Sequence, residues 1–474
     1  MNKTAKNTMI YMVGTVVLAV FGFLNTMLLT RVLSTHVYAL YGLFTSFGSS
    51  AAMLISLGLD ASYMRFYYYV NLKKKTFLFK CLLLPMIAFV IFLILMLEPS
   101  RTLVNKVFDE PITTACIVLI CVYIFLQVLQ RFTQISARME ERAGNYVVST
   151  IVGKVGYVLL IFAFGWIGIQ LEFNVIVVAF VVTSFFALII NAPIILTPKQ
   201  NIYGHEVISH KELFLYGFPT CINSTLVLLI PVVERIVIRD LAGWEILSIY
   251  TAAAIFQTVV SIVSLMIDNL WNPIVYKKYE NESEFKPLMH NFSLTVTIIL
   301  TIALASVILL RRWLVLILDK SYADVMIIAP AIFYAASLLP LTSILGVGIN
   351  IRKKTVHYIV SPLLQLVTSV ILCYVLVPKY ELIGIGIAVL ASAFISRFYR
   401  ILIGLKYYST DRKEVKCFAL MFVCMMLSAL SMFNTSLRFD VFAFISIVAI
   451  TLVIINRETV TLISFISKLF NKNV

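Results

Sequence analysis

Apolar residues form fourteen long runs, separated by short polar segments along the whole chain. The runs begin near residues 9, 38, 76, 112, 145, 172, 213, 244, 288, 324, 356, 382, 415 and 440. A transmembrane helix needs about 20 apolar residues to cross about 30 Å of hydrocarbon. The pattern therefore predicts an all-α polytopic membrane protein with about fourteen transmembrane helices. No gap between runs is long enough for a folded domain outside the membrane, so we expect the function to lie inside the helix bundle.

The composition excludes several other classes of protein. Of the 474 residues, 61% are hydrophobic and 13% are charged, whereas soluble domains are about half apolar and about a quarter charged. This rules out a soluble enzyme, a disordered protein and a disulfide scaffold. The seven cysteines lie in or beside apolar runs, and their odd number argues against a disulfide or metal framework. The five histidines show no spacing typical of a metal site.

The distribution of the basic residues indicates the membrane topology of the chain and not nucleic-acid binding. The chain has 38 Lys and Arg against 23 Asp and Glu, and its basic clusters, such as 73–75, 352–354 and 412–413, fall in alternate loops. Loops rich in Lys and Arg stay on the cytoplasmic side. We therefore predict that both termini are cytoplasmic. The first apolar run has no clear cleavage site, which indicates an uncleaved first span.

Two halves of the chain repeat each other. Residues 33–41 resemble residues 241–250, and the preceding Arg31 and Arg239 are 208 positions apart. The same offset relates Asp60 to Asp268, each of which ends an apolar span, and residues 142–149 match residues 354–361 at an offset of 212. We therefore predict two parallel six-helix lobes, 1–205 and 206–410, followed by two C-terminal helices in 411–474. Parallel repeats with a cavity between lobes are typical of transporters.

Charged residues at membrane depth are the candidate functional residues, because such charges are expensive and usually face a bundle interior or a cavity. Glu234 and Arg235 follow an apolar segment that contains Pro231. Two interpretations remain open: an interfacial pair that reaches the headgroups, or a cavity carboxylate whose protonation or cation binding is coupled to a gradient.

Asp60 and Asp268 also have two interpretations, as helix caps at the cytoplasmic interface or as an inner gate suggested by their symmetric recurrence. Arg65 follows Asp60 by five residues and is a candidate partner for it or for an anionic headgroup. Arg397 and Arg400, near a span end, resemble basic anchors on the cytoplasmic side.

Lys154 lies inside the fifth apolar run, nine residues after Asn145, and its repeat equivalent is the uncharged Leu366. A lone lysine at this depth favours a cavity position. Lysine and arginine bind phosphate through charge-assisted hydrogen bonds, so a cationic cavity suits an anionic substrate such as a diphosphate headgroup. The chain contains no Gly-rich phosphate loop, HExxH or GxSxG motif. We therefore expect a transporter and not an enzyme, without a cofactor and driven passively or by ion gradients and membrane potential.

Residues 22–41 (GFLNTMLLTRVLSTHVYALY), residues 54–66 (LISLGLDASYMRF) and residues 271–279 (WNPIVYKKY) carry a family resemblance. They resemble the bacterial polysaccharide flippases of the multidrug/oligosaccharidyl-lipid/polysaccharide (MOP) exporter superfamily. Ser34 departs from the family's frequent glycine. Lipid II flippases, which also have two extra helices, carry an arginine where this chain has Asn25. That departure, with the Asp60 and Arg65 pattern, favours an O-antigen or capsule repeat-unit flippase.

The resemblance implies two six-helix lobes that work by alternating access in the bacterial plasma (inner) membrane. It implies transfer of undecaprenyl-diphosphate-linked oligosaccharides from the inner to the outer leaflet, for O-antigen, capsule or exopolysaccharide synthesis. The expected partners are this lipid-linked oligosaccharide, membrane lipids, a polysaccharide polymerase and a chain-length regulator, without nucleic acid. Protons or Na⁺ are the expected coupling ions. We expect substrate contacts from Lys154, Arg235, Arg31, Arg65 and Asn25, and coupling or gating by Glu234, Asp60 and Asp268.

Three other functions remain as alternatives. A lipid II flippase shares the extra helices, and a multidrug exporter shares the superfamily. A polysaccharide polymerase or ligase is also polytopic, but it typically needs a sizeable external loop, and the external gaps here are short.

Overall fold

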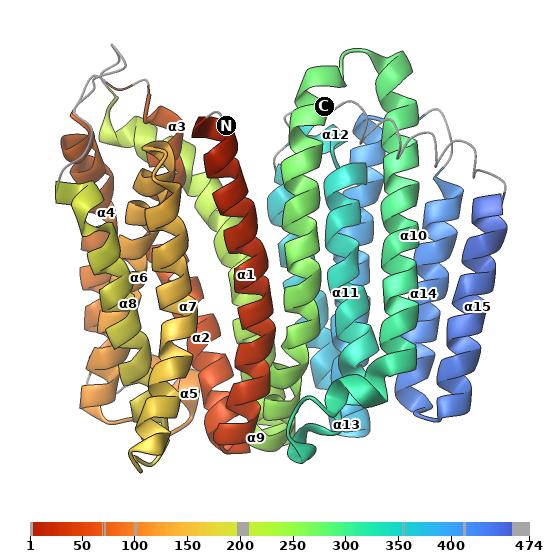
Figure 1. Ribbon diagram of the computed structural model, residues 1–474, viewed down its shortest axis with the longest axis horizontal. Coiled ribbons are helices and arrows are strands. Elements are labelled where there is room, and N and C mark those ends of the chain that lie inside the picture. The colour runs from red at the N-terminus through yellow and green to blue at the C-terminus, as the bar shows by residue number, and fades with distance from the viewer. Residues whose placement is uncertain are drawn as a thin grey trace. The chain divides into compact units, whose positions relative to one another are not determined.

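The computed structural model describes residues 3–68, 70, 73–98, 102–196, 208–352, 354, 356–410 and 414–456, and these form helices without a strand. The helices are α1 (Lys3–Val32), α2 (Thr35–Ile55), α3 (Leu59–Phe66), α4 (Lys74–Met96), α5 (Thr102–Phe108), α6 (Thr114–Met139), α7 (Ala143–Trp166), α8 (Phe173–Leu196), α9 (His210–Lys278), α10 (Glu282–Val315), α11 (Val325–Leu345), α12 (Gly348–Ile351), α13 (Val356–Tyr407), α14 (Val415–Phe433) and α15 (Leu437–Asn456), with a 3₁₀ turn at Lys320–Tyr322. Figure 1 shows them in chain order.

The predicted spans coincide with these helices. Ten of the described helices are long and apolar enough to cross a membrane. Two of the ten are bent: α9 breaks at Gly243 (φ 82°) and α13 at Glu381 (φ 44°), so each holds two predicted spans. With α1 and α15 the fourteen runs are accounted for. The predicted starts differ from the observed ones most at residue 9 against Lys3 and residue 288 against Glu282. The all-α polytopic fold is thus confirmed.

The chain forms two compact units, Met1–Ile236 and Val237–Val474. The predicted division near residue 205 lies outside the described residues and stays a prediction, as does the separate segment 411–474. The first unit includes the N-terminal part of α9, because this part packs against α2 and α3. Ser50 Oγ donates to the Leu228 carbonyl at 2.6 Å, and Ser62 Oγ donates to the Leu213 carbonyl at 2.6 Å.

Aromatic rings fill the centre of the first unit. The ring centroids of Phe44 (α2) and Tyr123 (α6) lie 4.9 Å apart, and Phe180 (α8) packs edge-on against both, at 5.4 Å and 5.5 Å. Gly48 of α2 makes room for this cluster, since a Cβ there would lie 2.7 Å from the Tyr123 ring. The outer face of α4 is different. Its large side chains, including Phe79, are mostly exposed, as expected for a helix that faces lipid.

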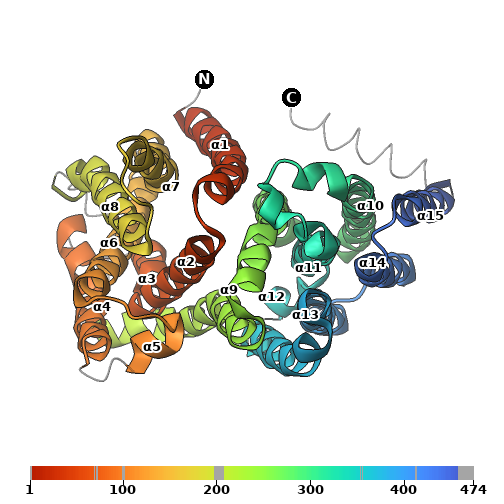
Figure 2. The same cartoon turned by 90° about the horizontal axis from the view of Figure 1, so that it is seen from below.

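Helix α11 is the central element of the second unit. Within its most apolar stretch 83% of the residues are buried, against 22% for α4, so α11 is surrounded by protein. It packs against α10, α13 and α14. Figure 2 shows α14 and α15 beside α10, at the edge of this unit.

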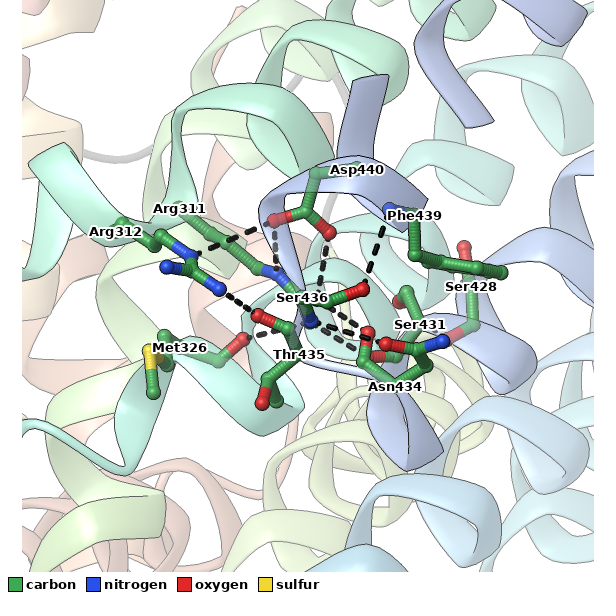
Figure 3. A network of polar contacts seen from close by, with 10 residues as sticks. All are labelled: Arg311, Arg312, Met326, Ser428, Ser431, Asn434, Thr435, Ser436, Phe439 and Asp440. Carbon is green, nitrogen blue, oxygen red and sulfur yellow. Dashed lines mark hydrogen bonds and ion pairs between the residues drawn. The ribbon is translucent and has the colours of Figure 1, made fainter. Parts of the chain in front are cut away.

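A buried ion pair attaches α15 to α10. Arg311 of α10 and Asp440 of α15 are both fully buried, and Arg311 Nη2 lies 2.6 Å from Asp440 Oδ1. Figure 3 shows the arginine also donating to the carbonyls of Ser431 (2.6 Å), in the last turn of α14, and Asn434 (2.8 Å), just after it. These bonds satisfy carbonyl groups at the end of α14 that the helix itself leaves unpaired. The C-terminal helix pair is therefore docked on its unit by specific polar contacts.

Candidate functional site

Three polar side chains join α1, α2 and α7 inside the first unit, and we call Asn25, Tyr41 and Tyr157 the polar cluster. The Asn25 amide nitrogen donates to the Tyr157 hydroxyl at 3.3 Å and to the Lys154 backbone carbonyl at 2.9 Å. The hydroxyls of Tyr41 and Tyr157 lie 3.0 Å apart. The Tyr157 ring stacks on Phe180 with centroids 4.1 Å apart. The cluster thus ties three helices together at the position of Lys154.

The Lys154 ammonium group is available to bind an anion. Its backbone carbonyl is held by Asn25, but its side chain is exposed. Within the described part of the chain, no hydrogen bond or ion pair engages the ammonium group. A lysine in this condition has its full hydrogen-bonding capacity for an anion.

Arg235 lies on α9 and is buried. Its Nη1 atom donates to Ser46 Oγ of α2 at 2.7 Å and to the Pro231 carbonyl, one helical turn earlier, at 3.2 Å. Its positive charge acts electrostatically on the Tyr41 hydroxyl. Arg235 therefore belongs to the same region as the polar cluster. The adjacent Glu234 is also buried, with 4% of its surface exposed.

The structure corrects the expected setting of Asp60. It does not end the second span, because α2 ends at Ile55 and Asp60 lies in the first turn of the separate short helix α3. Its carboxylate binds Arg131 of α6, with Nη2 2.7 Å from Oδ2. Arg131 therefore takes the place that the sequence had suggested for Arg65, which is exposed.

Helix α3 is held between α6 and α9. Ser136 Oγ of α6 donates to the hydroxyl of Tyr63 at 3.0 Å, and burial raises the pKa of this phenol, so that it stays neutral. On the other side, Gly58 and Gly217 are in backbone contact, and a Cβ on either would collide with the other. Gly58 also needs its freedom from a side chain for its φ of 72°. The Asp60–Arg131 pair is thus part of a tight three-helix junction.

The remaining predicted residues do not join these contacts. Arg31 is exposed at the end of α1. Asp268 lies within α9 and is partly exposed, without an ion pair to any described residue. Asp268 and Asp60 therefore occupy equivalent positions in the sequence repeat but differ in their surroundings.

Sequence reasoning did not select Tyr41, Tyr157, Ser46 or Arg131. Tyrosine and serine are too frequent in this chain to stand out, and Arg131 follows a glutamine-containing segment that resembles a span end. Among the described residues no group of three or more His, Cys, Asp or Glu side chains is arranged to hold a metal ion.

Comparison with solved structures identifies the fold. The chain is similar to the lipid II flippase MurJ in an inward closed conformation, with a TM-score of 0.67, 15% identity, and coverage of 95% of this chain and 100% of that chain. It is also similar to an inward-facing multidrug resistance MATE family transporter of the MOP superfamily, with a TM-score of 0.61, 14% identity, and coverage of 83% and 96%. At these identities the likeness concerns the fold, which is that of the MOP superfamily transporters.

Sequence comparison then places the chain within a family. The model of a family described as polysaccharide biosynthesis protein matches residues 4–274. The chain is 29% identical over 203 residues to the capsular polysaccharide biosynthesis protein CapF of Staphylococcus aureus; this stretch is 41% of the chain and spans half the length of that relative. Because the family model covers more than half of the chain, the protein belongs to this polysaccharide biosynthesis family.

Proposed function

We propose that the protein is a flippase that moves undecaprenyl-diphosphate-linked oligosaccharide repeat units from the inner to the outer leaflet by alternating access. The proposal is supported by membership of a polysaccharide biosynthesis family and by the transporter fold. The observation that carries it is the exposed Lys154 ammonium, which no described side chain neutralises. The buried Arg235 is connected to the same polar cluster through Tyr41. Two cations in an apolar bundle favour an anionic substrate, and phosphate oxygens bind well to both groups.

The other residues take defined roles in this proposal. Asn25, which also donates to the Tyr157 hydroxyl, holds the backbone carbonyl of Lys154 and so orients its side chain. Arg31 and Arg65, both exposed at helix ends, meet the headgroup or sugar as it enters or leaves. Glu234, buried next to Arg235, is the candidate coupling acid for H⁺ or Na⁺. Asp60, at the junction of α3, α6 and α9, and Asp268 are the candidate inner gate.

Sidedness of the substrate tests the proposal. In a deletion strain, lipid-linked repeat units are probed from outside the plasma membrane with a non-permeant lectin or glycan-cleaving enzyme. We expect the repeat units to accumulate on the cytoplasmic face of the deletion strain. The wild-type gene should restore their transfer to the outer face, and so should Lys75→Ala, the control at an exposed lysine of the same unit. Lys154→Ala should not restore it. Repeat units on the outer face would contradict flipping and favour a polymerase or ligase. No accumulation on either face would favour drug export.

Lipid II is the nearest alternative substrate. The similarity to MurJ concerns the fold and does not identify the substrate. The effect of depleting the protein on lipid II transfer and peptidoglycan synthesis therefore has to be measured as well. An arrest of peptidoglycan synthesis with intact surface polysaccharide would transfer the proposal to lipid II.

A further inference from the structure

Two arginines of the second unit lack an acceptor for their guanidinium groups among the described residues. Arg397 and Arg400 lie on the C-terminal arm of α13, and neither guanidinium makes a hydrogen bond or an ion pair with a described residue. The Nε atoms of both are shielded from solvent, while the side chains as a whole are partly exposed. Arginine cannot lose its proton in a protein, so both groups stay charged. Shielded charged donors without an acceptor are costly, and native proteins normally pair them.

The arrangement of the two arginines increases this cost. Residues three apart on a helix share one face, with Cβ atoms about 5–6 Å apart, and the two positive charges act on each other. Arg400 is held in place by Tyr358, the third residue of α13, whose ring centroid lies 4.3 Å from the guanidinium carbon. An anion that binds both groups removes the repulsion.

The surrounding polar side chains do not supply that anion. His357 is engaged by the hydroxyls of Tyr399 (2.7 Å) and Tyr407 (3.2 Å). The Tyr358 hydroxyl donates to Asn350 Oδ1 at 2.7 Å. These side chains form hydrogen bonds with one another and not with the two arginines. The one acidic residue between positions 346 and 410 is Glu381, at the break between the arms of α13, so it is far along the helix from Arg397.

Position along the helix sets the kind of anion. Arg397 is ten residues, or about 15 Å, before Tyr407, the last residue of α13. Both residues therefore lie within a span that contacts α11 and α12, and Arg352 Nε, just after α12, donates to the Tyr407 carbonyl at 3.5 Å. A ligand at this level carries its negative charge next to an apolar part. Planar guanidinium groups match tetrahedral phosphate oxygens through paired hydrogen bonds.

We propose that Arg397 and Arg400 form a binding site for the phosphate of a membrane amphiphile, separate from Lys154 and Arg235. Two sources have this chemistry, an anionic phospholipid and a polyprenyl diphosphate. The site is a property of the second unit and does not depend on the proposed flippase activity. Its ligand, in contrast, determines whether it serves transport or anchors the protein in the leaflet.

Native mass spectrometry of the purified full-length protein tests the site with phosphatidylglycerol, undecaprenyl diphosphate and zwitterionic phosphatidylcholine as probes. We expect Arg397→Gln/Arg400→Gln to weaken binding of at least one anionic probe by about tenfold or more. Arg397→Lys/Arg400→Lys keeps the charge and loses the paired geometry, so it retains part of the affinity. The control Lys379→Gln/Arg438→Gln removes two exposed positive charges from the same unit and leaves binding unchanged.

The pattern of loss identifies the source of the phosphate. Loss for both anionic probes indicates a general phosphate site for membrane lipid, and loss for undecaprenyl diphosphate alone indicates a site for the transported lipid. Unchanged binding of both probes by the glutamine variant overturns the proposal. If that variant is not recovered folded, the lysine variant decides, because wild-type affinity for both probes would contradict paired arginine binding. The assay measures lipid binding alone, so a failure of the flippase proposal does not affect it.

Discussion

Arg311 Nη2 and Asp440 Oδ1 lie 2.6 Å apart, and neither side chain is exposed at all. The residues are 129 positions apart and join α10 to the last described helix. Because the arginine also binds carbonyls of Ser431 and Asn434 at the end of α14, this single side chain contacts both helices of the C-terminal hairpin.

Asp440→Asn should therefore destabilise the protein severely. It leaves Arg311 buried without a counter-charge, a change that typically costs about 3–5 kcal/mol. Thermal unfolding in detergent measures the effect, with Arg438→Gln, an exposed arginine on the same helix, as the control. Equal melting temperatures for Asp440→Asn and wild type would show that the hairpin is docked by apolar packing instead.

The Asp60–Arg131 pair should show strong coupling. Its side chains are 8% and 34% exposed, respectively, so solvent screens it only in part, and a double-mutant cycle with Asp60→Asn and Arg131→Gln should give a coupling energy of about 0.5–3 kcal/mol. Transport should fall in either single variant if the pair acts as the inner gate. Additive effects on stability would mean that the two side chains do not depend on each other, and full surface polysaccharide in Asp60→Asn would exclude the gate.

Tyr157→Phe should loosen the link between α1, α2 and α7. It removes the hydroxyl that accepts from Asn25 and contacts Tyr41, at a cost of about 1 kcal/mol. Transport should fall further than stability because the backbone at Lys154 loses a support. The matched control is Tyr380→Phe, at a tyrosine that is 50% exposed. A reduction in transport of the same size in both variants would argue against a role for the polar cluster.

Glu234→Gln should separate coupling from binding. The variant keeps the size of a buried side chain and removes its ability to release a proton or bind a cation. We expect normal expression, retained binding of the lipid substrate, and loss of transport that responds to an imposed ion gradient. Glu245→Gln, at an exposed glutamate of the same helix, should behave as wild type. Full surface polysaccharide from Glu234→Gln at normal expression would remove the coupling role.

Gly48→Ala should cost about 1–3 kcal/mol through overpacking. The added methyl group would lie 2.7 Å from the Tyr123 ring, in the aromatic centre of the first unit. Gly144→Ala is the control, since nothing lies within 4 Å of its Cβ position and alanine favours the helix there. Unfolding midpoints of the two variants provide the comparison. A loss no larger at Gly48 than at Gly144 would show that Tyr123 moves aside freely.

The sequence alone determined the spans and the class of fold. Runs of apolar residues are long because each must cross hydrocarbon as a helix. The predicted starts at residues 356 and 382 therefore match the first residue of α13 and the residue after its break at Glu381. The repeat between residues 31–41 and 239–250 also has a structural counterpart. Ser34 caps α2, and Gly243 breaks α9 two positions after the matching Leu241.

Only the tertiary structure decided which charges are paired. Helices that are apolar on most faces carry little signal for the face that turns inward. The sequence therefore suggested Arg65 for Asp60, where the structure has Arg131 at 71 positions' distance. It also gave no indication that Arg311 pairs with Asp440. Partners such as these meet because distant helices pack side by side, and the packing depends on side-chain shape and not on the apolar pattern along the chain.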